Sequence, residues 1–266
     1  MPGIMEIPVA SWHQAVFFRK SRRSFIPGRP VAEDQLERLR ELTAKFRPFD
    51  GARLALVPES PQAVLTGLVG SYGRITGAPA FGVMIGALSV PDIAARVGYT
   101  GEGLILEATA LGLGTCWVSG MFKEDEVRKR AHLEPEERIF AIAPLGVGER
   151  DFSWKEKIYK GALGSQKRKS PDDLTEGCVP LPWQESAVKA ARVAPSARNR
   201  QPWSFVFEPD SITVLRDPGP DGERYPKSLD CGIAMLHLEL GARAAGAPGR
   251  WTFLDPPAIA RYRMIP

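Results

Sequence analysis

The sequence predicts an α+β protein in which helices surround a central sheet. Two observations carry this prediction. Amphipathic or apolar segments with helical periodicity alternate with short runs of β-branched and aromatic residues, and the first part of the chain resembles the last part. With 266 residues, the chain can form one large domain or two small ones. Its content of 44% hydrophobic and 25% charged residues is ordinary for a globular protein.

Hydrophobic periodicity defines the expected helices. Residues 33–46 place four apolar side chains on one face and acidic residues in the first turn. Residues 101–111 are almost wholly apolar, which predicts a buried helix, and Gly112 is suited to end it. Further helices are expected over residues 12–20, 124–131, 183–193 and 231–245.

The expected strands are short and apolar, and they fall between these helices. They cover residues 53–57, 80–85, 139–147, 204–207 and 212–216. The segment 148–175 is polar and basic and has no clear strand pattern. We therefore expect this segment to wrap over the surface.

The chain matches itself in two ungapped blocks. Residues 41–60 align with residues 192–211, and a second register aligns Gly98 with Gly232. Because both blocks occur in the same order, we interpret them as a duplication rather than as chance similarity among helices rich in alanine and glycine. The sequence therefore predicts two pseudo-repeated halves in one chain.

Composition argues against several classes of protein. A net charge of +4 does not by itself imply a nucleic-acid partner. The three cysteines are far apart and form neither a disulfide framework nor a zinc pattern, and the three histidines are equally scattered, so we expect no metal site. The N-terminus lacks the layout of a signal peptide, and the longest apolar run, residues 104–121, falls short of a membrane span of ~20 apolar residues. A cytoplasmic location and no membrane partner are expected.

Three motifs carry most of the functional information. Residues 195–203 read Pro-Ser-Ala-Arg-Asn-Arg-Gln-Pro-Trp, residues 22–24 read Arg-Arg-Ser, and residues 111–120 read Leu-Gly-Leu-Gly-Thr-Cys-Trp-Val-Ser-Gly. Together they resemble the motifs of the FMN-dependent nitroreductase family. In ordinary members the Pro-Ser motif follows the Arg-Arg-Ser helix within the first third of the chain. Here it comes after the mid-chain turn.

The duplication accounts for this changed order. Ordinary nitroreductases are homodimers whose flavin sites draw on both subunits, so the resemblance implies a two-halved branch in which one chain is a fused pseudo-dimer. Its halves would be residues 1–170 and the shorter residues 171–266, packed closely around one flavin site. The N-terminal half lacks the Pro-Ser loop, because Lys45, Pro48 and Asp50 stand where Ser196, Asn199 and Gln201 stand in the other half. Further dimerisation of the pseudo-dimer is left open.

The resemblance also implies which residues bind FMN. Arginine and serine side chains suit a phosphate, backbone N–H groups after a strand stabilise charge on a reduced ring, and carboxamides both donate to and accept from a flat heterocycle. The implied residues are Arg22, Arg23, Ser24, Arg74, Trp117, Val118, Ser119, Gly120, Arg168, Pro195, Ser196, Ala197, Asn199 and Gln201. For Arg74 and Arg168 the alternative is a solvated loop residue. No side chain is expected to act as nucleophile or base.

The resemblance therefore implies an FMN-dependent oxidoreductase. Hydride from NAD(P)H would pass to flavin N5 and then to an electron-poor acceptor such as a nitroaromatic or a quinone. Two other classes remain open: a flavin-binding sensor or storage protein without turnover, and a nucleic-acid or membrane binder that uses the basic residues 155–169. The sequence does not distinguish NADH from NADPH and does not identify the acceptor.

Overall fold

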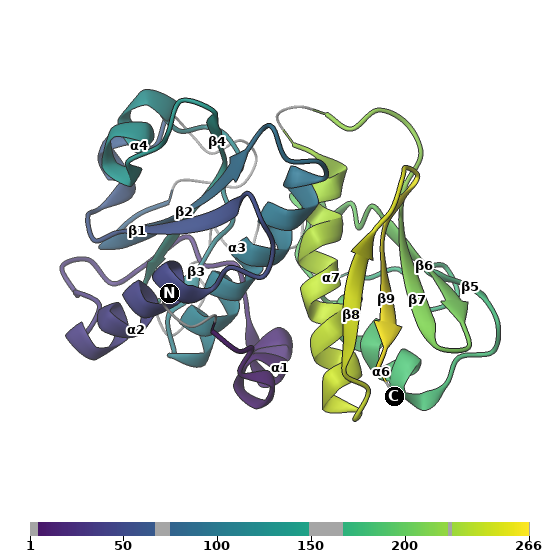
Figure 1. Ribbon diagram of the computed structural model, residues 1–266. Coiled ribbons are helices and arrows are strands. Elements are labelled where there is room, and N and C mark those ends of the chain that lie inside the picture. The colour runs from purple at the N-terminus through teal and green to yellow at the C-terminus, as the bar shows by residue number, and fades with distance from the viewer. Residues whose placement is uncertain (1–4, 67–74, 149–166, 223–224, 266) are drawn as a thin grey trace.

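The computed structural model describes residues 5–66, 75–148, 167–222 and 225–265 (Figure 1). Helices and sheets are both present, which confirms the α+β class. The strands of the described residues form two sheets, one in each half of the chain, where one central sheet was expected. The two sheets stand at opposite sides of the molecule, with long helices between them (Figure 1).

The first sheet is antiparallel and has the strand order β1-β2-β4-β3. Its strands are β1 (Ala52–Val57), β2 (Ala80–Ala87), β3 (Gly114–Thr115) and β4 (Glu137–Gly146). The helices of this half are α1 (Val9–Phe18), α2 (Glu33–Lys45), the 3-10 turn η1 (Pro61–Ala63), α3 (Ile93–Ala110) and α4 (Glu124–Ala131). Helix α3 packs on this sheet, and α1 packs against α3.

The second sheet has the strand order β5-β6-β7-β9-β8. Its strands are β5 (Thr175–Gly177), β6 (Trp203–Glu208), β7 (Ser211–Arg216), β8 (Gly249–Phe253) and β9 (Ala258–Met264). Its helices are α6 (Pro182–Ala191), the 3-10 turn η3 (Ala197–Asn199) and α7 (Lys227–Ala244). Strand β5 pairs in parallel with β6, and the other neighbouring strands are antiparallel.

Local sequence accounts for several element boundaries. Helix α2 has two acidic residues in its first turn and a lysine in its last, which complements the helix dipole. Helix α4 has the predicted bounds. Helix α3 is longer than predicted, because its N-terminal part is buried against other elements, and Gly112, with φ of 78°, follows its end. Helix α1 begins and ends earlier than predicted, and β8 and β9 were not predicted.

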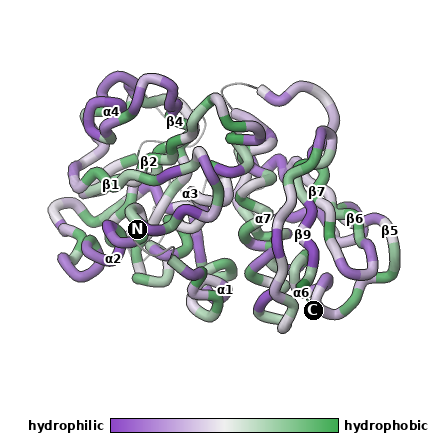
Figure 2. Tube along the Cα trace, in the orientation of Figure 1, coloured by the Kyte–Doolittle hydropathy of each residue, from purple (hydrophilic) through white to green (hydrophobic). Residues whose placement is uncertain are grey.

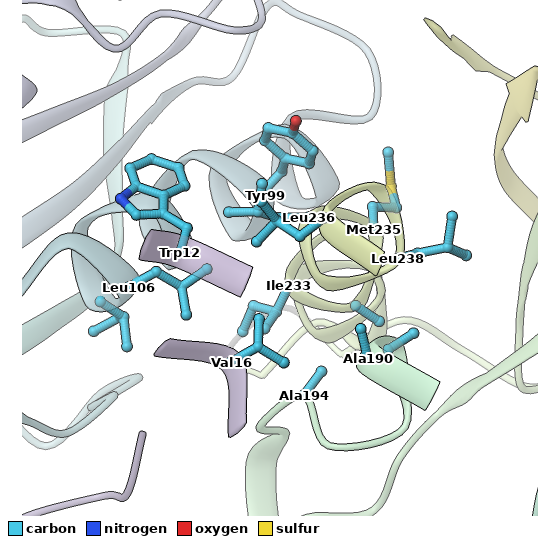
Figure 3. Close-up of a cluster of buried hydrophobic side chains, with 14 of the residues drawn as sticks. Trp12, Val16, Tyr99, Leu106, Ala190, Ala194, Ile233, Met235, Leu236 and Leu238 are labelled. Carbon is cyan, nitrogen blue, oxygen red and sulfur yellow. The ribbon is translucent and has the colours of Figure 1, made fainter. Parts of the chain in front are cut away.

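The core is centred on the contact between α3 and α7. Figure 3 shows Trp12, Tyr99 and Leu106 from the first half close to Ile233 and Leu236 on α7. All five side chains are buried. Hydrophilic residues are concentrated at the periphery, most clearly along α4 (Figure 2). Among the described residues, no helix is both long and apolar enough to cross a membrane.

Two glycines allow α3 and α7 to approach closely. A Cβ atom on Gly98 would lie 2.0 Å from the carbonyl oxygen of Leu229, and one on Gly232 would lie 1.9 Å from the carbonyl oxygen of Ala95. The register that pairs Gly98 with Gly232 also pairs Ala95 with Leu229. Each helix therefore makes the same contact on the other, as in an isologous two-fold interface.

Candidate functional site

A cavity of about 450 Å³ lies between the two halves. The first half contributes Ser21, Arg23, Cys116, Trp117, Val118, Ser119, Gly120 and Met121. The second half contributes Pro195, Ser196, Ala197, Arg198, Arg200, Tyr225, Leu229, Asp230 and Ile233. The structure thus brings eight of the predicted site residues together in one cavity, and its volume lies within the ~300–1,000 Å³ of typical small-molecule sites.

The turn after β3 forms one wall of this cavity. Val118 is anchored to β4 by mutual backbone hydrogen bonds with Ile142. Gly120 and Met121 follow at positive φ, 86° and 62°, so the backbone turns back sharply. Within the described residues, the N–H groups of Ser119 and Gly120 donate no hydrogen bond. This wall therefore offers two backbone donors to a ligand.

The indole of Trp117 is fixed by a buried polar network. Its Nε1 donates to Oε2 of Glu102 at 2.7 Å, and the other oxygen of Glu102 lies 2.9 Å from Nε2 of His237. Both Glu102 and His237 are fully buried. The guanidinium of Arg19 approaches the same carboxylate at 3.7 Å. Because both halves contribute to this network, it also ties the cavity wall to α3 and α7.

The Arg-Arg-Ser segment runs beside the first sheet. The N–H of Arg22 donates to the carbonyl of Thr115 at 2.7 Å, and Ser24 bridges to Thr76. Arg23, which was predicted to bind the phosphate of FMN, lines the cavity. Arg22 and Ser24 are not among the lining residues, and the stem of Arg22 packs against Gly114.

The loop that contains the Pro-Ser motif has an unusual backbone. Arg198, Asn199 and Gln201 have positive φ values of 53°, 54° and 47°. Such values are uncommon for residues other than glycine and are enriched at functional sites. The Oγ of Ser196 closes the loop by accepting from the N–H of Gln201 at 2.9 Å. The loop thereby presents Ser196 and Ala197 to the cavity.

The two carboxamides of this loop do not line the cavity. The amide nitrogens of Asn199 and Gln201 donate to the carbonyl of Lys167 at 2.8 and 3.2 Å. The Oε1 of Gln201 accepts from the N–H of Lys169 at 3.0 Å. These two side chains therefore bind segment 167–169. The sequence had instead predicted that they contact the ring of the ligand directly. The physical reason is that this segment has backbone groups that need partners beside the loop.

Arg168 has a structural environment of the same kind. Its guanidinium donates to the carbonyls of Ala194 and Val193 at 2.9 and 3.2 Å and to Oδ1 of Asn199 at 2.9 Å. Burial, with a smaller contribution from nearby arginines, lowers the pKa of Arg168 to about 10. The side chain thus supports the Pro-Ser loop and does not line the cavity. Arg74 lies outside the described residues.

The most informative residues that the sequence did not suggest are Asp230 and Arg200. Asp230 is buried in the first turn of α7 and forms an ion pair with Arg200 at 2.8 Å. Its carboxylate also accepts from the N–H of Ala197. Arg200 lies within the Pro-Ser motif but was not among the residues expected to bind FMN. Asp230 directly precedes the helix predicted over residues 231–245, so that prediction did not single it out.

The lining groups differ in character around the cavity. Arg23 supplies a cation, Ser119 and Gly120 supply backbone donors, and Leu229 and Ile233 supply apolar surface. A flat ring that carries an anionic group needs this combination: apolar faces, donors at the rim and a positive charge for the anion. The cavity therefore fits a phosphorylated heterocycle.

Comparison with known proteins identifies the family. The sequence profile of a family described as "Putative TM nitroreductase" matches residues 12–242. The chain belongs to this nitroreductase family. Membership gives it a general oxidoreductase role. No curated protein sequence matches the chain.

Two solved structures illustrate the similarity. One, described as "a putative nitroreductase" from Thermotoga maritima, has 20% sequence identity and a TM-score of 0.65, and the match covers 98% of this chain and 97% of that one. This match shows that the nitroreductase-family protein shares the fold. The other, an FMN-dependent nitroreductase from Clostridium difficile, has 15% sequence identity and a TM-score of 0.42. The match covers 52% of this chain and 88% of that one.

Proposed function

We propose that this nitroreductase-family protein binds FMN in the cavity between its halves and transfers hydride from NAD(P)H to an electron-poor acceptor. The observation that carries the proposal is the joint cavity. The first half contributes Arg23 and the backbone N–H groups of Ser119 and Gly120, and the second contributes Ser196 and Ala197. The cofactor would supply hydride transfer, and the protein would supply binding, orientation and electrostatics.

The lining residues would divide these tasks by their chemistry. Arg23 would hold the phosphate through charge-assisted hydrogen bonds. The N–H groups of Ser119 and Gly120 would donate to the ring edge and stabilise the negative charge that reduction places there. The Pro-Ser loop and the turn after β3 would exclude water from opposite sides of the ligand.

We also propose one cofactor per chain, with residues 1–170 and 171–266 acting as the halves of a pseudo-dimer. Both repeat registers are consistent with this division. The register of the second block aligns helix α3 with helix α7 over their full lengths. It pairs their first residues, Ile93 and Lys227, and their last residues, Ala110 and Ala244. The strand order β1-β2-β4-β3 has the same form as β6-β7-β9-β8, with the same antiparallel pairings. A duplicated unit explains both observations.

The donor, the acceptor and the cell compartment belong to the same proposal. A nitroaromatic or a quinone is the expected acceptor class, and either NADH or NADPH would serve as donor. The three cysteines, Cys116, Cys178 and Cys231, all lie within the described residues and form no disulfide bond there, which fits a reducing cytoplasm. A monomer would suffice for a complete site, because both walls come from one chain.

The test is an absorbance spectrum of purified protein reconstituted with FMN, followed by anaerobic addition of NADH or NADPH. We expect a bound flavin spectrum, a flavin-to-chain ratio near one by amino-acid analysis, and bleaching by one of the two donors. Reoxidation by a nitroaromatic or a quinone would complete the cycle. A protein that binds no FMN contradicts the proposal. Bound flavin that neither donor reduces would instead favour a sensor or storage role.

A further inference from the structure

Asp230 is placed to control the shape of the cavity. It lies in the first turn of α7, is 4% exposed and lines the cavity. Both of its carboxylate oxygens lie 3.2 Å from the N–H of Ala197, and its Oδ2 accepts from Nε of Arg200 at 2.8 Å. One buried carboxylate therefore holds two points of the Pro-Ser loop.

Arg200 extends this connection to a third segment. Its Nη2 donates to the carbonyls of Tyr225 and Pro226, each at 3.0 Å. The loop, the residues that precede α7, and α7 itself are thus joined through one carboxylate–guanidinium pair. Hydrogen bonds of this charged type are stronger than neutral ones.

The loop needs such an anchor because its backbone is strained. Arg198, Asn199 and Gln201 all occupy the left-handed region, which residues with a Cβ atom adopt at a cost. Such conformations persist only where surrounding contacts enforce them. Segment 167–169 holds the loop from one side through Asn199 and Gln201, and Asp230 holds it from the other.

We propose that ionised Asp230 is a positioning residue, which holds the Pro-Ser loop in its binding shape and releases it on protonation. As far as it concerns FMN affinity, this inference rests on the function proposed above. Its structural part, the hold of Asp230 on the loop, is independent of any ligand.

The surroundings of Asp230 determine where it titrates. Burial, with a smaller contribution from the nearby carboxylate of Asp221, raises the pKa of Asp230 to about 6, while Arg200 and the N–H of Ala197 act in the opposite direction. Because both opposing groups belong to the loop, release of the loop would raise the pKa of the buried carboxyl group further, so protonation favours release. Arg23 and Arg198 are the other charged groups that line the cavity. Below about pH 6 the carboxyl group is therefore neutral, and its charged contact with Arg200 is lost. At neutral pH and above, the contact is present.

The direct test follows the Ala197 amide by NMR in cofactor-free protein between pH 5 and 8. We expect its proton shift to change with a midpoint near pH 6, and Asp230→Asn to abolish the change. Asp221→Asn is the matched control, since Asp221 binds the N-terminus of α7 and not the loop, and the titration should persist. An Ala197 amide that does not titrate, or that titrates equally in Asp230→Asn, overturns the inference.

A second variant tests the same contact without altering Asp230. Arg200→Gln removes the cation that stabilises the ionised carboxylate, so the midpoint of the Ala197 titration should rise by ~1 pH unit or more. An unchanged midpoint would show that Arg200 and Asp230 are not coupled, and this would overturn the proposed hold on the loop.

The functional test compares FMN affinities by quenching of flavin fluorescence at pH 7.5 and pH 5. The phosphate of FMN itself loses charge near pH ~6, so the informative quantity is the difference between wild type and Asp230→Asn. We expect the affinity of wild type to fall about tenfold more than that of the variant, as one linked proton allows over this range. Riboflavin, which has no phosphate, should show the same difference.

The outcomes separate the two proposals. Parallel pH profiles for wild type and Asp230→Asn would overturn the positioning role while leaving FMN binding intact. Failure of wild type to bind FMN at either pH would contradict the proposed function. In that case the Ala197 titration still decides whether Asp230 holds the loop.

Discussion

The two halves place very different side chains at equivalent positions. In the first repeat register the cavity-lining Arg200 aligns with Phe49, and in the second register three of the cavity-lining residues have counterparts that take part in one aromatic cluster. These pairs are Ser119 with Phe253, Ile233 with Tyr99, and Asp230 with Arg96. In three of these four pairs, a residue without an aromatic ring on the cavity side corresponds to an aromatic residue in the other half.

The aromatic residues pack on one another, at positions where the proposed duplication would place a second cavity. The ring of Phe49 lies 4.9 Å from that of Tyr99 and 5.0 Å from that of Phe253, both edge to face. The guanidinium of Arg96 lies 4.2 Å from the ring centre of Phe253. Such contacts stabilise a packed cluster and leave little room for a ligand.

Under the proposed duplication, the same arrangement of backbone elements is open on one side and filled on the other, and the difference lies in side-chain volume. Both halves keep the antiparallel strand order and a long helix that crosses its counterpart at a glycine. The difference lies in the residues at the ends of these elements. An aromatic cluster that fills the space corresponding to the cavity would leave one cofactor site per chain, as proposed above.

The largest expected effect comes from filling the open side. Ser119→Phe installs the residue found in the filled half, so its ring should occupy the space of the ligand. We expect FMN affinity to fall at least about a hundredfold, ~3 kcal/mol, with the free energy of unfolding changed by less than ~1 kcal/mol. Flavin fluorescence titration and chemical denaturation measure the two quantities. Unchanged affinity would place the ligand elsewhere.

The reciprocal change is the matched control. Phe253→Ser removes an aromatic ring from the cluster, so it should lower the free energy of unfolding by ~2 kcal/mol. FMN affinity at the open side should remain as in wild type, because Phe253 does not line that cavity. A large loss of affinity in this variant would mean that the two sides are not independent.

The next effect concerns the arginine that the first half contributes to the cavity. Arg23→Ala removes the cavity-lining arginine, and loss of a charge-assisted phosphate contact should weaken FMN binding by ~1.5–3 kcal/mol. Riboflavin affinity should change much less, since riboflavin has no phosphate. Equal losses for both ligands would show that Arg23 does not contact the phosphate.

The helix crossing offers a symmetrical test. The variants Gly98→Ala and Gly232→Ala each introduce a Cβ atom that would lie only 2.0 and 1.9 Å, respectively, from a carbonyl oxygen of the other helix. We expect each variant to lose ~2 kcal/mol in free energy of unfolding, because overpacking outweighs the better helix propensity of alanine. Urea denaturation compares them. A large loss in one variant and none in the other would argue against a two-fold crossing.

Sequence alone predicted much of the fold because periodicity and glycine positions are local signals. The helix over residues 124–131 has the predicted bounds. Strand β9 was missed although its charged and apolar residues alternate around Tyr262, a pattern typical of a half-buried strand. Two sheets in place of one could not be predicted, since the pairing of strands depends on tertiary contacts.

The site was predictable only where motifs carried it. The turn around Ser119 and the loop at Ser196 do line one cavity. The side chain of Gln201 binds segment 167–169, a contact between parts of the chain that no short pattern reveals. Asp230 was missed for the same reason, because its partner Arg200 lies thirty residues away along the chain.

The smallest expected effect tests the pair formed by Asp230 and Arg96. These residues occupy equivalent positions near the starts of α7 and α3, but one anchors a loop and the other covers an aromatic cluster. Arg96→Gln keeps a polar side chain and removes the cation over Phe253, so it should lower the free energy of unfolding by ~0.5–1 kcal/mol. Because guanidinium groups stay charged under ordinary conditions, this loss should be equal at pH 5 and pH 8. Denaturation at both pH values measures it, with Arg96→Lys as the variant that retains a cation and recovers part of the loss. A loss that changes between pH 5 and pH 8 would show that a titrating group contributes on the filled side too, and the contrast with Asp230 would then fail.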